Sequence, residues 1–174
     1  VKTINYDGTL QYSARAFPSI SRQFFESFFL FKIFGKSKIF GSYFMTWWDH
    51  KDIKEVDWLS GSFMFLKKEI FEGINGFDED YFMYSEYTDI CLRLKRKGYK
   101  NYYFPGYSIM HLDSAIASMD LLSRELGIWK SRRLYFKKNY SHFYALTVSG
   151  FYFLGVLNRM LIYFLLFIFS FKKN

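Results

Sequence analysis

The C-terminal stretch from Phe143 to Phe171 contains one charged residue, Arg159, and residues 160–169 are apolar apart from Tyr163. A membrane-spanning helix needs about 20 apolar residues, and an arginine at its centre costs about 2.5–3.5 kcal/mol. We therefore expect residues 141–174 to form a hydrophobic helical tail that associates with a membrane. If Arg159 ends one helix and starts another, the tail lies in the interface or inserts as a hairpin. An ordinary core or dimer helix is the other alternative.

The net charge narrows the class of partner, and the cysteine content limits the possible disulfides. Lys and Arg total 24 against 16 Asp and Glu, a net charge of +8, which favours nucleotide diphosphates, acidic lipids or nucleic acid. No nucleic-acid-binding motif accompanies this charge, so we expect no nucleic acid partner. The single cysteine, Cys91, excludes an intrachain disulfide. The run from Lys2 to Thr9 is typical of a strand and turn, so we expect a further segment upstream of Val1.

Turn residues and apolar periodicity predict alternating strands and helices. The predicted helices cover residues 21–35, 67–72 and 86–97, and the predicted strands cover residues 56–66, 99–104 and 107–111. We expect the 56–66 strand to be interrupted at Ser60-Gly61-Ser62, where the backbone must come close to another group. The alternation indicates an α/β fold, with residues 1–140 forming one domain.

The helix predicted over residues 86–97 brings two acids together. Its apolar face is formed, at helical spacing, by Tyr87, Ile90, Cys91 and Leu94. Glu86 and Asp89 are three residues apart and project the same way, and a carboxylate there could remove a proton from a hydroxyl group. The alternative is structural: Asp89 pairs with Arg93 at i+4, and Glu86 favours the helix N-terminus, each effect contributing about 0.3–1 kcal/mol.

Short motifs follow one another in a fixed order through this region. They are Trp58-Leu59-Ser60-Gly61, Asn75-Gly76-Phe77-Asp78, Glu86-Tyr87-Thr88-Asp89 and His111-Leu112-Asp113. In this order they resemble the acceptor half of family 2 glycosyltransferases, in particular the rhamnosyltransferase-like group. The resemblance implies a partial GT-A fold that lacks its N-terminal nucleotide-binding half. It departs from the family at Tyr87, where relatives usually carry the acid that serves as catalytic base.

The resemblance implies roles for individual residues. With Tyr87 in the usual acid position, Glu86 and Asp89 are the candidates for the base, with Glu86 ahead. The substrate-binding candidates are Trp58, Ser60, Gly61, Asp78, His111, Lys130 and Arg133. An aromatic face and a close glycine backbone suit a sugar ring, and the two cations suit a diphosphate. A tryptophan in an ordinary core is the alternative for Trp58.

A divalent metal, Mg²⁺ or Mn²⁺, is also implied for the full-length enzyme, with His111 as a candidate ligand. One histidine is a weak metal signal, because a divalent ion needs several ligands at once. We expect the remaining ligands on an Asp-x-Asp strand of the N-terminal half.

The implied function is inverting transfer of a sugar, with rhamnose from a dTDP donor as one candidate, from a nucleotide-sugar to a glycan or lipid-linked acceptor. Such an enzyme would serve cell-surface polysaccharide synthesis at the cytoplasmic face of a bacterial plasma membrane, with Lys172 and Lys173 on that side. We expect this fragment alone to turn nothing over. The alternatives are a catalytically inactive protein that binds only glycan or lipid, and a membrane-surface structural protein with no sugar site.

Overall fold

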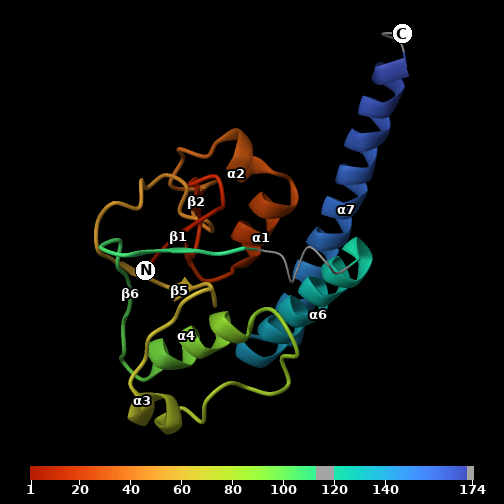
Figure 1. Ribbon diagram of the computed structural model, residues 1–174. Coiled ribbons are helices and arrows are strands. Elements are labelled where there is room, and N and C mark those ends of the chain that lie inside the picture. The colour runs from red at the N-terminus through yellow and green to blue at the C-terminus, as the bar shows by residue number, and fades with distance from the viewer. Residues whose placement is uncertain (113–119, 172–174) are drawn as a thin grey trace.

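The computed structural model describes residues 1–112 and 120–171. They form a body of mixed helices and sheets from which one long helix projects (Figure 1). The strands are β1 (Lys2–Ile4), β2 (Leu10–Gln11), β3 (Ala14–Arg15), β4 (Lys54–Val56), β5 (Trp58–Leu59), β6 (Asn101–Tyr103) and β7 (Ser108–Met110). The helices are α1 (Ile20–Ser27), α2 (Leu30–Ile33), α3 (Lys68–Gly73), α4 (Glu86–Arg96), α6 (Leu121–Asn139) and α7 (His142–Phe171). The predicted mixture of helix and sheet and the hydrophobic C-terminal helix are both confirmed.

The strands pair in small sheets. β1 lies between β2 and β7, antiparallel to β2 and parallel to β7. β3 pairs antiparallel with β5, and β4 pairs antiparallel with β6. The parallel pairing of β1 with β7 brings the chain just beyond Met110 next to the N-terminal strand.

Two predicted elements differ from the structure. The strand predicted over residues 56–66 is interrupted at Asp57, between the end of β4 and β5, and it stops at Leu59, because the chain turns at Gly61 and Ser62. The helix predicted over residues 21–35 is divided into α1 and α2 at Phe29, which adopts a left-handed conformation with φ 58°. Ser27, at the end of α1, lies against Gly155 of α7, so the chain changes direction where the long helix crosses it.

The main core lies between the helices. It includes Ile90 and Leu94 of α4, Tyr135 and Phe136 of α6, and Val148 of α7. The apolar face predicted for α4 is therefore confirmed, and the first turns of α7 belong to the same core. The predicted boundary between residues 140 and 141 falls in the turn that joins α6 to α7.

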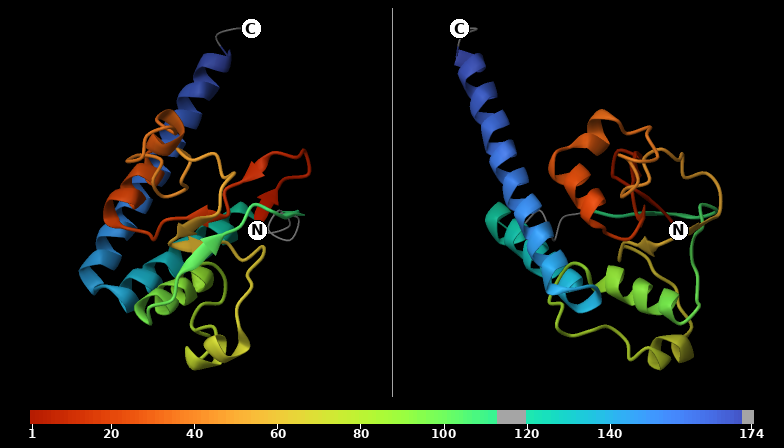
Figure 2. Two further views of the ribbon diagram at one scale, coloured as in Figure 1. Left: turned by 90° about the vertical axis from the view of Figure 1, so that its left-hand side faces the viewer. Right: turned by 180° about the vertical axis from the view of Figure 1, so that it is seen from behind.

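Helix α7 has two parts with different surroundings. The docked half, His142–Arg159, packs beside α1 and α6 (Figure 2). The free half, Met160–Phe171, continues away from the body (Figure 1), and its side chains from Met160 to Ile168 are 37% to 71% exposed. By length and composition alone, His142–Ile168 is long and apolar enough to cross a membrane.

Candidate active site

Two consecutive residues in the left-handed region introduce helix α4. They are Tyr84, with φ 67°, and Ser85, with φ 63°. This conformation costs a non-glycine residue about 1–3 kcal/mol and persists only where the surroundings fix it. Helix α6 supplies the support: the Ser131 hydroxyl donates to the carbonyl of Met83, and the ring of Tyr84 lies against Gly127. The supported turn fixes the position of the next residue, which begins α4.

That first residue of α4 is Glu86, whose carboxyl is half-buried. Its Oε2 atom is buried and has no hydrogen-bond partner among the described residues. Burial raises the pKa of Glu86 above its ordinary value, because loss of water penalises the charged form, and the residue's own backbone N–H opposes this shift. A carboxylate with a raised pKa and an unused oxygen is equipped to accept a proton.

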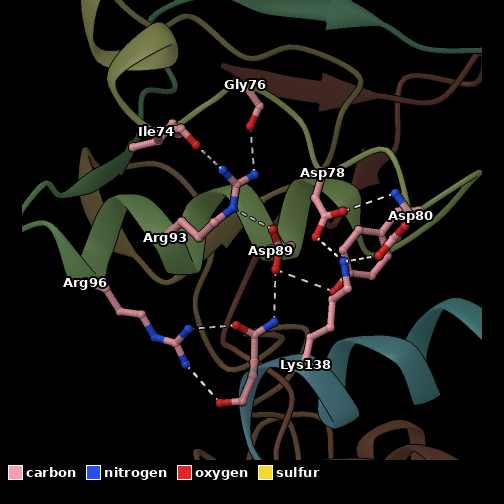
Figure 3. Close-up of polar contacts among 10 residues, drawn as sticks. Ile74, Gly76, Asp78, Asp80, Asp89, Arg93, Arg96 and Lys138 are labelled. Carbon is pink, nitrogen blue, oxygen red and sulfur yellow. Dashed lines mark hydrogen bonds and ion pairs between the residues drawn. The ribbon is translucent and has the colours of Figure 1, made fainter.

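Asp89 is placed differently, in a network that Figure 3 shows. Its side chain is 4% exposed. Nε of Arg93 donates to Oδ2 at 2.7 Å, and Nδ2 of Asn139 donates to Oδ1 at 2.9 Å. The Arg93 guanidinium also donates to the carbonyls of Ile74 and Gly76 at 2.5 and 2.8 Å. Both carboxylate oxygens of Asp89 are thus engaged: Oδ1 joins α4 to α6, and Oδ2 holds Arg93, whose guanidinium reaches the turn at residues 74–76. The structure therefore contains the i+4 pair between Asp89 and Arg93 that was the structural alternative to a catalytic Asp89.

Asp78 and Asp80 share one cation. Nζ of Lys138 lies 2.5 Å from Oδ2 of each (Figure 3). The hydrogen bond from Lys138 lowers the pKa of Asp78 below its ordinary value. The run Asp78-Glu79-Asp80 has the Asp-x-Asp spacing expected of a metal-binding strand, but here it lies in a loop. In this structure an ammonium group from α6 occupies the place between the two carboxylates.

Gly61 lies under the ring of Tyr87. A Cβ atom at position 61 would stand 1.9 Å from Cε2 of that ring, so no larger residue fits while the ring stays there. The ring also contacts Phe77, edge to face at a centroid distance of 5.4 Å. The close approach predicted at Gly61 is therefore made by Tyr87.

Trp58 is 7% exposed and belongs to the main core. Its indole Nε1 donates to the carbonyl of Ala16 at 2.9 Å. The guanidinium of Arg15 lies 5.1 Å from the ring centroid. This is the arrangement of a core tryptophan, which was the alternative to a sugar-stacking role.

Hydroxyl groups connect the end of β5 to the sheet that carries His111. Ser60 Oγ lies 3.2 Å from Ser62 Oγ, which lies 3.2 Å from Oγ1 of Thr3 on β1. His111 follows β7, the parallel neighbour of β1, and its Nδ1 lies 3.1 Å from Oε1 of Gln11. Two of the predicted binding residues, Ser60 and His111, are thus linked through neighbouring strands.

The predicted cations of α6 lie elsewhere on that helix. Lys130 is exposed, and the guanidinium of Arg133 lies 5.7 Å from the centroid of the Trp129 ring. Neither makes a hydrogen bond or ion pair to the α4 region among the interactions of the described residues; from α6, Lys138 pairs there with Asp78 and Asp80. No group of three or more His, Cys, Asp or Glu side chains in the described part of the chain could hold a metal ion. Among residues 1–112 and 120–171, His111 therefore has no set of partner ligands for a metal ion.

The supporting contacts of this region have weak sequence signals. Neither Tyr84 nor Ser85 is a glycine or an asparagine, the residue types that usually mark a left-handed turn. Ser131 reaches a carbonyl 48 residues away, and Lys138 reaches an acid 60 residues away. The opposite charges of residues 78–80 and 137–138 are the sequence feature that could have indicated the pairing of Lys138 with Asp78.

Part of the chain is similar to curated rhamnosyltransferases. Rhamnosyltransferase WbbL of Escherichia coli (strain K12) is 46% identical over 56 residues, 32% of this chain and 21% of that protein. The N-acetylglucosaminyl-diphospho-decaprenol L-rhamnosyltransferase of Mycobacterium tuberculosis (strain CDC 1551 / Oshkosh) is 32% identical over 88 residues, 51% of this chain and 29% of that protein. The chain therefore matches less than a third of the length of either relative. No family model and no solved structure matches. The similarity to rhamnosyltransferases supports a glycosyltransferase family for this chain.

Proposed function

We propose that this chain is the acceptor-side part of an inverting, family 2 glycosyltransferase with a partial GT-A fold, and that Glu86 is its general base. The observation that carries the assignment is the contrast between two acids of one helix. Glu86 has a buried oxygen without a partner in the described residues, whereas both oxygens of Asp89 accept hydrogen bonds. The similarity to rhamnosyltransferases supports the reaction class.

In the proposed reaction the Glu86 carboxylate removes the proton from an acceptor hydroxyl as the hydroxyl oxygen attacks the anomeric carbon of the donor sugar. The bond from that carbon to the nucleoside diphosphate breaks on the opposite face, so the configuration inverts and the diphosphate leaves with the bonding electrons. A raised pKa makes Glu86 a stronger base at neutral pH. Asp89 acts as a positioning residue, because it holds Arg93 and the turn at residues 74–76 against α4.

The proposed donor is a nucleotide-sugar, with dTDP-rhamnose as one candidate, and the proposed acceptor is a glycan or a lipid-linked glycan. The M. tuberculosis relative is named for L-rhamnose and for a diphospho-decaprenol substrate, and the apolar helix α7 is compatible with work at the cytoplasmic face of a bacterial plasma membrane. Lys130 and Arg133 remain the candidates for contact with the donor diphosphate. A divalent Mg²⁺ or Mn²⁺ would need ligands from outside the described residues, because these gather no metal-binding group.

Sugar transfer by the complete product of the reading frame that encodes this chain tests the proposal. Membranes containing that product are incubated with a panel of nucleotide-sugars, and the wild type is compared with Glu86→Gln. We expect Glu86→Gln to lower kcat by about 10²–10⁴-fold, the usual contribution of a general base. Glu79→Gln, an exposed acid of the preceding loop, is the matched control and should leave transfer unchanged.

The other results each have a defined meaning. Transfer that is indifferent to Glu86→Gln contradicts the base assignment. Absence of transfer with every donor, combined with retained glycan or lipid binding, favours the catalytically inactive binding protein.

A further inference from the structure

Helix α7 changes its surroundings at Arg159. The guanidinium of Arg159 lies 3.6 Å from the carboxylate of Glu125 on α6 and 5.9 Å from the ring centroid of Phe29. One turn earlier, Gly155 lies against Ser27 of α1. The body therefore holds α7 as far as Arg159, and the charge of this arginine is balanced by protein at that point.

The free half of α7 is too short to cross a bilayer by itself. Its residues, Met160 to Phe171, rise about 18 Å at about 1.5 Å per residue, roughly half of a hydrocarbon core of about 30 Å. Helices that lie flat in the interface have a polar face. From Met160 to Phe169 the sequence offers none, since Tyr163 carries its only polar group. The apolar run from Met160 to Phe169 fits upright insertion into one leaflet. This orientation departs from the expectation that Lys172 and Lys173 stay on the cytoplasmic side, because it carries the end of the chain toward the bilayer centre, where charge is costly.

A second surface suited to lipid lies at the same end of the body. Helix α2 begins directly after Phe29, the residue whose ring faces Arg159. Figures 1 and 2 both show α2 at the end from which the free half of α7 emerges. This surface, the α2 patch, consists of Lys32, Ile33, Phe34, Lys36, Lys38 and Ile39. The two isoleucines are 66% exposed and Phe34 is 50% exposed.

The positive charge of the α2 patch favours an anionic membrane surface as its partner. Its three lysines are exposed, and the sequence has no acidic residue between Glu26 and Asp49. Apolar side chains interspersed with lysines match the interface of a leaflet that contains acidic headgroups, where each lysine near the surface strengthens binding.

We propose that the protein sits on one leaflet of an anionic membrane, with the free half of α7 inserted upright and the α2 patch against the headgroups. In this orientation α7 does not cross the bilayer, and the docked half stays on the side of the body. The orientation goes beyond the proposed sugar transfer and does not depend on it, because lipid is the only ligand involved.

Fluorescent labels along α7 test the orientation. Single cysteines replace Leu146, Leu154 or Phe164, which are 50%, 49% and 60% exposed. The natural Cys91 should stay unlabelled, because burial removes it from reagents and raises its thiol pKa to about 11; unlabelled wild type verifies this. On vesicles of phosphatidylcholine and phosphatidylglycerol, lipids with quenchers at different depths locate each label. We expect position 164 in the hydrocarbon, and positions 146 and 154 in water, where iodide quenches them.

Two other depth profiles would overturn the proposal. The docked half has exposed apolar side chains that include Leu146 and Leu154, so a helix lying flat would place all three labels at one shallow depth. A helix that crosses the membrane with His142–Ile168 would place position 154 deepest, because the middle of that segment lies at Gly155. Sugar transfer plays no part in these measurements, so their failure leaves the proposed reaction untouched.

Replacement of the lysines tests the α2 patch separately. The triple variant Lys32→Gln, Lys36→Gln, Lys38→Gln should bind phosphatidylglycerol-containing vesicles about 100-fold more weakly, at roughly five-fold per lysine. Binding to pure phosphatidylcholine should not change. A control with the same change in net charge replaces exposed lysines around α3, at the opposite end of the body (Figure 1): Lys67, Lys68 and Lys100. Equal losses in the two triple variants would contradict a specific role for the α2 patch.

Discussion

Replacement of Asp89 by Asn should destabilise the protein. The Asp89 side chain is 4% exposed, and its two oxygens accept from Arg93 at 2.7 Å and from Asn139 at 2.9 Å. An amide at position 89 would turn an NH₂ group toward one of these donors. Removal of one partner of a buried ion pair costs about 3–5 kcal/mol. Arg93 is 24% exposed and keeps its bonds to the carbonyls of Ile74 and Gly76, so we expect a loss of about 2–3 kcal/mol.

Urea and thermal unfolding measure this loss. The urea midpoint should fall with an unchanged m value, and the Tm should fall by about 4–12 °C, at about 2–4 °C per kcal/mol for a chain of this size. Glu86→Gln is the matched control, because it makes the same chemical change one turn earlier in α4. Its free energy of unfolding at neutral pH should stay unchanged or rise, since the variant removes a buried charge whose Oε2 has no hydrogen-bond partner in the described residues.

The two variants can also refute the reasoning together. If Asp89→Asn unfolds at the wild-type urea concentration and yet abolishes sugar transfer, then Asp89 acts in the reaction and its network is not structural. The base assignment would then move from Glu86 to Asp89.

Three further predictions concern pH and packing. Because burial raises the pKa of Glu86 and the base acts when deprotonated, kcat/KM for transfer should rise with pH through a value above that of a free glutamic acid, and Glu86→Gln should abolish this rise. Gly61→Ala should lower the free energy of unfolding by about 1–3 kcal/mol in urea, because the ring of Tyr87 must move; adding Tyr87→Ala should relieve this clash. Lys138 lowers the pKa of Asp78, so their pairing stabilises the fold above the ordinary pKa of aspartic acid and loses that effect as pH falls through the lowered value. Lys138→Gln should therefore lower the Tm at pH 7, by an amount that corresponds to about 0.2–1 kcal/mol for a partly exposed pair, and the difference should vanish in strong acid.

Local patterns in the sequence predicted the elements that depend on local contacts. The helical spacing of Ile90, Cys91 and Leu94 correctly predicted α4 and its buried face. Such features are predictable because neighbours along one helix determine them. The preference for Glu86 over Asp89 as the base came from the family resemblance and stays a prediction; in the structure, Oε2 of Glu86 has no hydrogen-bond partner among the described residues.

Contacts between distant segments could not be predicted in the same way. The i+4 spacing indicated that Arg93 could pair with Asp89, but the partner Asn139 comes from the far end of α6. The division of the helix predicted over residues 21–35 depends on α7, which reaches Ser27 from more than a hundred positions along the chain. The sequence predicted that another group comes close to the backbone at Gly61, and the structure shows that this group is the ring of Tyr87.

Helix α6 contacts both the apolar helix α7 and the turn that precedes Glu86. Glu125 on this helix pairs with Arg159 of the apolar helix, and fewer than two turns later Ser131 supports the turn that precedes Glu86. In the proposed orientation and reaction, α6 would therefore transmit a displacement of the lipid-inserted helix to the proposed base, Glu86, without any change in the sheets. The proposal thus predicts that the choice of detergent or lipid during purification affects sugar transfer, because weak turnover in solubilised protein would reflect a displaced α6 as well as a defective base.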